Sequence, residues 1–187
     1  MKIIGVTGGM GCGKSTICNI LKHNGFIVLN ADEIYHHILL NNLSMIEEIT
    51  LAFGKSVLDN NQVIARERLA KLAFQSNRSI KLLNSITHKY ISNEIYKSII
   101  HNKDHKLIAI DCPLPIKHGF LDVCHHIWTV YAHLDTRIKR IMQRSSLPAK
   151  EVLNRIKLQP PIKKYISLAD KIIYNNSSIN NIHHKIN

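Results

Sequence analysis

The sequence predicts an α/β protein built on a mostly parallel sheet, and three observations support this fold class. At the start of the chain, an apolar run at residues 3–7 is followed by glycines and then by helical spacing over residues 14–23. Further along, short apolar runs alternate with helical patterns. Residues 44–102 look mainly helical, and we expect this stretch to be an insertion above the sheet.

The first half of the chain begins with a strand, a glycine-rich turn and an amphipathic helix. The apolar residues of the helix at 14–23 recur on one face, and Gly25 is a suitable stop signal. A second short strand is expected at residues 26–29. It leads through Asn30-Ala31-Asp32, a segment that could cap the next helix, into a helix at about residues 33–40.

The second half of the chain repeats the alternation of helices and strands. We expect helices at residues 66–74, 77–100, 135–144 and 149–158, and strands at residues 106–110, 127–132 and 171–174. The polar tail at residues 177–187 is expected to be frayed.

The bulk composition is that of a globular protein with a basic surface. The chain has 187 residues, with 25 Lys and Arg against 13 Asp and Glu, so its formal net charge is +12. Such a balance suits anionic partners such as nucleotides or phosphorylated substrates. Heavy use of Ile, Asn and Lys throughout also fits a compositional bias, so the charge alone does not select a function.

Membrane and disulfide-based classes are disfavoured. No apolar run approaches the roughly 18–20 residues that a membrane span needs, and the short apolar start lacks a signal-cleavage pattern, so we expect a cytoplasmic protein without a membrane partner. None of the four cysteines forms a C-x-x-C pair, so we interpret them as structural or incidental thiols: Cys12, Cys18, Cys112 and Cys124.

The most informative motif is the glycine-rich loop, which fits G-x-x-x-x-G-K-[ST] at residues 8–15. Glycines let the backbone bring several N–H groups close to phosphates, and the start of a helix adds a positive end. Lys14 supplies a charge for the β- and γ-phosphates, and the Ser15 hydroxyl is suited to Mg²⁺. We therefore predict a nucleotide-phosphate site at Gly8, Gly9, Gly11, Cys12, Gly13, Lys14, Ser15 and Thr16.

The loop predicts nucleotide binding but does not choose between a kinase and other nucleotide-binding classes. A GTPase usually carries an N-K-x-D guanine reader, and the nearest match, Asn102-Lys103-Asp104-His105, has His in the last position. The chain is also short for a motor or a transporter ATPase.

A more specific signal comes from ordered blocks between Ile4 and Asn176. The first is the loop in the form T-G-G-x-G-x-G-K-S-T. The later blocks are Asn30-Ala31-Asp32-Glu33-Ile34, Phe53-Gly54, Arg66, Leu69, Phe74, Ile86, His88, Asp111-Cys112-Pro113-Leu114, the basic segment 137–144, Arg155-Ile156, Gln159, and Ala169-Asp170 through Asn176. In this order the blocks resemble the dephospho-coenzyme A kinase family.

The resemblance implies a reaction and an architecture. ATP and dephospho-CoA would give ADP and CoA by phosphorylation of the ribose 3′-hydroxyl, the last step of coenzyme A synthesis. The implied fold is a single P-loop kinase domain with a five-stranded parallel sheet. Its core would span about residues 1–30, 105–135 and 168–187, with a helical substrate-binding insertion at about 32–104 and a lid at about 137–166.

The resemblance also implies roles for individual side chains. Asp32 would contact the acceptor hydroxyl as base or orienter, whereas the residues alone favour a helix cap. Arg140 and Arg144 stand four apart on one helix face and would bind the transferring phosphates, against the plainer interpretation of a solvated basic face. Arg137 and Lys139 are left on that solvated face.

Asp111 ends an apolar strand and is predicted as a second Mg²⁺ ligand, although such a strand end is common without any metal role. Arg66 would meet substrate phosphates, and His88 would pack or hydrogen-bond in the insertion. The histidine pairs His36-His37, His125-His126 and His183-His184 lack ligands at metal spacing and are taken as incidental.

The chain departs from the family pattern in places, and rival functions stay open. Asn30 replaces an acid, and Pro115 and Lys117 follow Asp111 where the family has a different pattern ending in an acid. The rivals are a small kinase for another acceptor, a nucleotide-binding regulatory or RNA-associated protein, and a decayed kinase. We expect dephospho-CoA as the small-molecule partner, no nucleic acid, and a monomer.

Overall fold

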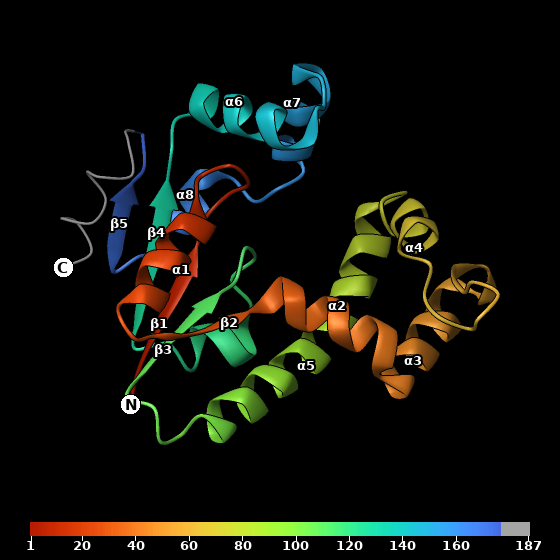
Figure 1. Ribbon diagram of the computed structural model, residues 1–187. Coiled ribbons are helices and arrows are strands. Elements are labelled where there is room, and N and C mark those ends of the chain that lie inside the picture. Colours follow the sequence, from red (N-terminus) through yellow and green to blue (C-terminus); the bar gives the residue numbers. More distant parts are fainter. Residues whose placement is uncertain (177–187) are drawn as a thin grey trace. The chain divides into compact units, whose positions relative to one another are not determined.

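The computed structural model describes residues 1–176, which divide into two compact units (Figure 1). One unit comprises Met1–Asn30 together with the chain from His101 onward, and it holds the sheet. The other comprises Ala31–Ile100 and is helical. The tail at residues 177–187, predicted to be frayed, lies outside the described residues.

The first unit is built on a five-stranded parallel sheet with the strand order β2-β3-β1-β4-β5. Its strands are β1 (Lys2–Thr7), β2 (Ile27–Asn30), β3 (Leu107–Asp111), β4 (His126–Tyr131) and β5 (Lys171–Tyr174). Its helices are α1 (Lys14–His23), α6 (Leu134–Ser145), α7 (Ala149–Lys157) and α8 (Ile162–Ile166), with an irregular turn η2 (Lys117–Leu121). The predicted α/β class and the five parallel strands are confirmed.

Alternation along β1 assigns its side chains to the two faces of the sheet. Ile4 and Val6 are buried against α1, in a core that includes Ile17 and Leu21 of that helix. On the other face, Gly5 lies beneath Phe120 of η2, and Thr129 of β4 donates a hydrogen bond of 2.8 Å to the carbonyl of Tyr165 in α8. The strand that leads into the glycine loop is therefore fixed from both sides.

A side chain at position 5 would collide with this second layer. A Cβ built on Gly5 would lie 2.7 Å from Phe120 Cζ and 2.8 Å from Cys124 Sγ. We expect Gly5→Ala to lower the free energy of unfolding by about 1–3 kcal/mol through overpacking, measured by denaturant unfolding. Because part of the clash is with Phe120, Gly5→Ala combined with Phe120→Leu should lose less than the sum of the two single variants. Additive losses would contradict the contact.

The second unit contains α2 (Ala31–Asn41), α3 (Leu43–Phe53), η1 (Lys55–Val57), α4 (Arg66–Ala73) and α5 (Asn77–His101). Glu48 ties α3 to α5, because it accepts hydrogen bonds from Lys89 Nζ at 2.6 Å and from the Tyr90 hydroxyl at 2.9 Å. These contacts hold the pKa of Glu48 below its usual value, the Lys89 hydrogen bond having the largest effect. The helical character predicted for this stretch is confirmed.

Two local expectations are corrected by the structure. Helix α2 begins at Ala31, directly after β2, so Asp32 lies in the first turn of the helix and not before it. A short helix, α8, follows Pro160 and Pro161 where no helix was predicted. Pro161 is the N-cap of α8, with extended backbone, and α8 buries Tyr165 in the unit.

Candidate active site

The glycine loop joins β1 to α1 at the carboxyl end of the sheet, where open α/β sheets bind ligands. Gly13 is the N-cap of α1 with φ 93°, no side chain caps the helix, and no acidic residue lies in its first turn. Gly8 and Gly11 also have positive φ angles. The positive helix end and its backbone N–H groups are thus left for an anion such as a nucleotide phosphate.

Lys14 and Ser15 begin α1 directly after this loop, with Lys14 half-buried and Ser15 exposed. Asp111 ends β3 and is buried. Burial, followed by the neighbouring Asp111 carboxylate, raises the pKa of the Cys18 thiol on α1, and the thiol is hydrogen-bonded to that carboxylate. The Asp111 carboxylate therefore lies against the first turns of the helix that carries Ser15.

The carbonyl of Cys12 is held from outside the loop. Asn175, the residue after β5, is buried and donates a hydrogen bond of 2.9 Å from Nδ2 to the Cys12 oxygen. Arg140 Nη1 of α6 reaches the same oxygen at 3.5 Å, and Arg140 Nη2 reaches Asn175 Oδ1 at 3.3 Å. A Cβ at Gly13 would collide with Asn175 Nδ2, so glycine is needed here for close approach as well as for its φ angle.

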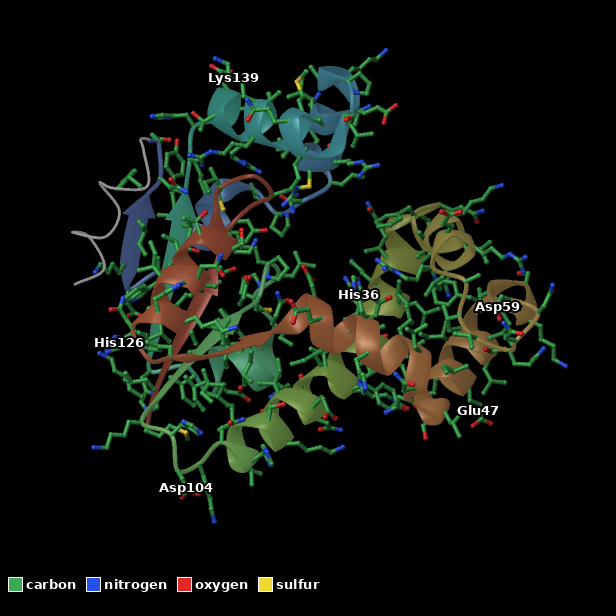
Figure 2. The ribbon with its side chains drawn as sticks, in the orientation of Figure 1. His36, Glu47, Asp59, Asp104, His126 and Lys139 are labelled. Carbon is green, nitrogen blue, oxygen red and sulfur yellow. The ribbon has the colours of Figure 1, made fainter. Side chains whose placement is uncertain are left out.

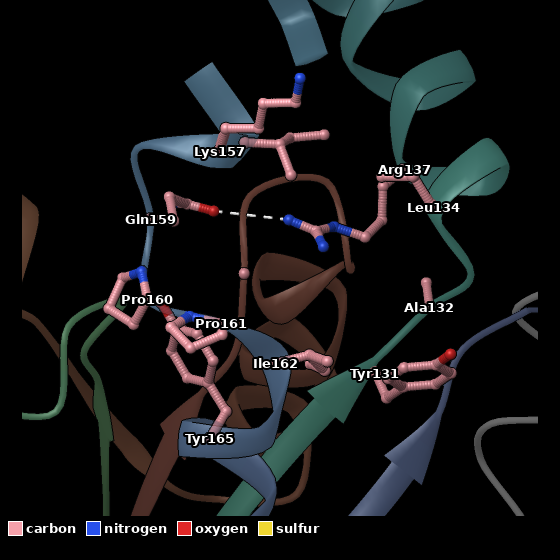
Figure 3. Close-up of a pocket in the computed structure, with 12 residues that line it drawn as sticks. Tyr131, Ala132, Leu134, Arg137, Lys157, Gln159, Pro160, Pro161, Ile162 and Tyr165 are labelled. Atoms are coloured by element: carbon pink, nitrogen blue, oxygen red, sulfur yellow. Dashed lines mark hydrogen bonds between the residues drawn. The ribbon is translucent and has the colours of Figure 1, made fainter. Parts of the chain in front are cut away.

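The peptide groups on either side of Met10 are held by a second arginine and a second amide. Gln159 Oε1 accepts a hydrogen bond of 2.8 Å from the Met10 N–H, while Arg137 Nε donates one of 2.8 Å to the Met10 carbonyl. Arg137 Nη2 also reaches Gln159 Oε1 at 3.4 Å, the bond drawn in Figure 3. The expectation of a solvated Arg137 is therefore wrong, whereas Lys139 is exposed on the outer side of α6 (Figure 2).

A cavity of about 430 Å³ adjoins this second contact. Its lining includes Gly9 of the loop, Arg137, and an apolar wall from Ala132, Pro161 and Tyr165 (Figure 3). Burial raises the pKa of the Tyr165 hydroxyl to about 12, so this group stays neutral. Burial likewise raises the pKa of the Cys12 thiol despite the nearby Lys14 and Arg137, which makes Cys12 a packing residue in its side chain.

The two predicted phosphate arginines differ in their surroundings. Arg140 is half-buried against the glycine loop, whereas Arg144, one turn further along α6, is exposed. The structure thus brings Arg140 to the loop, and the role of Arg144 stays a prediction.

In the helical unit, Asp32 is exposed in the first turn of α2, and Tyr35 lies three residues further along the same face. Burial raises the pKa of Tyr35, and the Arg66 guanidinium opposes that rise. Arg66 of α4 is therefore close to the side of α2 that carries Tyr35. His88 is half-buried in α5, and burial lowers its pKa.

Comparison with known proteins identifies the family. The family model described as dephospho-CoA kinase matches residues 2–181. The chain belongs to the dephospho-CoA kinase family. A dephospho-CoA kinase of Carboxydothermus hydrogenoformans is 34% identical to this chain over 188 residues, covering 100% of this chain and 91% of the relative.

Solved structures agree with this membership. A protein from Thermus thermophilus is similar with a TM-score of 0.82 and 27% identity, covering 99% of this chain and 94% of that one. Dephospho-CoA kinase from Campylobacter jejuni gives a TM-score of 0.63 and 29% identity, covering 98% and 93%. The dephospho-CoA kinase family uses ATP as co-substrate, which agrees with the glycine loop. Within residues 1–176, no helix is long and apolar enough to cross a membrane.

Sequence reasoning did not assign a role to Asn175 or Gln159. Both belong to blocks that carry the resemblance, but their partners lie 163 and 149 residues away in the chain. The available signal was the position of Asn175. It is a polar residue directly after strand β5, at the carboxyl end of the sheet, where the glycine loop also lies.

Proposed function

We propose that this member of the dephospho-CoA kinase family transfers the γ-phosphoryl group of ATP to the ribose 3′-hydroxyl of dephospho-CoA. The observation that carries the proposal is the glycine loop at the uncapped start of α1, with Arg140 and Lys14 beside it. The oxygen of the acceptor hydroxyl forms a bond to the γ-phosphorus, the bond from that phosphorus to the bridging oxygen breaks, and ADP leaves.

The residues of the chain have separate tasks in this transfer. Backbone N–H groups of the loop bind the phosphates, and Lys14 and Arg140 stabilise the negative charge on the transferring group. Arg144 adds a second guanidinium on the same side of α6. Asp32 orients the acceptor hydroxyl and takes the proton that it releases.

Two oxygen-bearing side chains near the start of α1 are suited to binding Mg²⁺. The Ser15 hydroxyl and the Asp111 carboxylate are oxygen ligands of the kind that Mg²⁺ prefers, and they would hold it together with phosphate oxygens and water. When bound, this ion would neutralise charge on the β- and γ-phosphates. Among residues 1–176, no three His, Cys, Asp or Glu side chains gather into a metal site, so a protein-only cage plays no part in the proposal.

The departures from the family pattern lie in the unit that holds the sheet. Asn30 is the register partner of Asp111, so the amide avoids a second carboxylate beside the proposed metal ligand. Lys117 is exposed and Pro115 is partly buried before η2. The proposal includes a monomeric enzyme in the cytoplasm, acting on small molecules and not on nucleic acid.

Acceptor choice tests the function. We expect purified protein with Mg²⁺ and ATP to release ADP when dephospho-CoA is added, and not with AMP, CMP or shikimate, as measured by a coupled ADP assay. Release driven by one of the other acceptors would move the chain to another small-kinase activity. ATP binding without release for any acceptor would favour a decayed or regulatory protein and direct attention to Pro115 and Lys117.

A further inference from the structure

Asn175 holds a single peptide group of the glycine loop. Asn175 is only 3% exposed, and its side-chain Nδ2 donates a hydrogen bond of 2.9 Å to the Cys12 carbonyl. Its backbone N–H donates a second hydrogen bond, of 2.7 Å, to the Tyr131 carbonyl. The second bond continues the pairing of β4 with β5, so the amide is anchored to the sheet. The position of the Cys12 carbonyl is thus set by the sheet and not by the loop alone.

The orientation of this carbonyl decides the orientation of a phosphate donor. The Cys12 C=O and the Gly13 N–H belong to one planar trans peptide and point in opposite directions. A carbonyl held outward by Asn175 therefore directs the Gly13 N–H into the loop, at the uncapped start of α1, which is suited to an anion.

Arg140 contacts the same Cys12 oxygen, and also the Asn175 side chain itself, through longer contacts. Its guanidinium reaches the Cys12 oxygen at 3.5 Å and Asn175 Oδ1 at 3.3 Å, and the side chain is half-buried. Both acceptors are neutral, and a guanidinium binds a phosphate oxygen more strongly than a neutral carbonyl. The geometry is suited to a cation that rests on the loop and leaves it when a γ-phosphate is present, while the Asn175 bond keeps the carbonyl paired.

We propose that Asn175 is a positioning residue that fixes the Cys12–Gly13 peptide and releases Arg140 to the γ-phosphate of ATP. This inference rests on the proposed kinase function, in which Arg140 binds the transferring group. The neutral amide is essential to it, because it offers Nδ2 as donor to the loop and Oδ1 as a weak acceptor for Arg140.

Asn175→Asp changes both properties at once. The carboxylate cannot donate to the Cys12 carbonyl, and it forms an ion pair that retains Arg140 in a partly buried position. Since an interaction of Arg140 with the γ-phosphate is worth about 10- to 100-fold in affinity, we expect the variant to lose about that much of the preference for a non-hydrolysable ATP analogue over ADP. Asn176→Asp is the matched control, because Asn176 Oδ1 accepts a hydrogen bond from the His133 N–H, which a carboxylate can also accept.

The test is calorimetric titration of both nucleotides into the wild type, Asn175→Asp, Asn176→Asp and Arg140→Ala, with thermal melting to confirm folding. We expect Asn175→Asp and Arg140→Ala to lose the preference for the ATP analogue, and Asn176→Asp to retain it. An equal fall in affinity for both nucleotides in Asn175→Asp would overturn the proposal, since a purely structural support of the loop gives that result.

Should Asn175→Asp fail to fold, Arg140→Ala still tests the proposal. Retention of the preference for the ATP analogue over ADP in that variant would overturn it. These titrations contain no dephospho-CoA. A wild-type protein that distinguishes the two nucleotides but does not phosphorylate dephospho-CoA would therefore contradict the proposed function and leave the role of Asn175 standing.

Discussion

Lys14→Ala should lower kcat with ATP and dephospho-CoA by about 10²–10³-fold while the protein remains folded. Lys14 is half-buried at the start of α1, directly after Gly13, where its ammonium group can reach phosphates held by the loop. The loss is expected mainly in kcat, because charge on the phosphoryl group moves during transfer. Steady-state kinetics with circular dichroism as a folding check measure it.

Lys139→Ala is the matched control, because it removes the same charge from an exposed position on α6. It should leave kcat within about twofold, since surface substitutions rarely disturb a site. Unchanged activity in Lys14→Ala, or an equal loss in both variants, would contradict the assignment of the phosphate loop.

Asp32→Asn should lower kcat by about 10²–10⁴-fold with little change in ATP affinity, the range typical of a lost general base. Asn retains the size of the side chain and can accept a hydrogen bond, but it cannot take the hydroxyl proton. The position of Asp32 in the first turn of α2 gives it a structural alternative, because a carboxylate there stabilises the helix by about 0.3–1 kcal/mol.

Kinetics and stability measured together separate the two roles of Asp32. Glu33→Gln is the control, since Glu33 is also an exposed acid in the first turn of α2. We expect similar small losses of stability in both variants and a large fall in kcat in Asp32→Asn alone. A stability loss with kcat preserved in Asp32→Asn would assign Asp32 to the helix terminus.

The sequence was most informative where a structural signal is local. The helix at Lys14–His23 and the strand at Lys171–Tyr174 were predicted at their observed bounds, and other strands were displaced by about one residue. Helix α8 was missed because five residues after two prolines carry too little periodicity. Asp32 was expected to lie before its helix because the sequence does not reveal that α2 starts without a connecting turn after β2.

In the candidate site, too, contiguous residues were predicted better than contacts between distant parts of the chain. The loop motif is contiguous, so its residues could be recognised from their order. Arg137 was placed on a solvated face because helical spacing cannot show that its guanidinium meets the Met10 carbonyl, 127 residues away. Asn175 and Gln159 act through contacts of the same long range, which depend on the strand order of the sheet and not on neighbouring residues.

The most direct test of the central claim is to identify the position of the new phosphate. Product formed from ATP and dephospho-CoA should show one added phosphomonoester on the ribose 3′-oxygen by ³¹P NMR and mass spectrometry. A 3′-deoxy analogue of dephospho-CoA should bind and yield neither product nor ADP above the background without acceptor. Phosphorylation of that analogue, or a phosphate found elsewhere on the acceptor, would contradict the account.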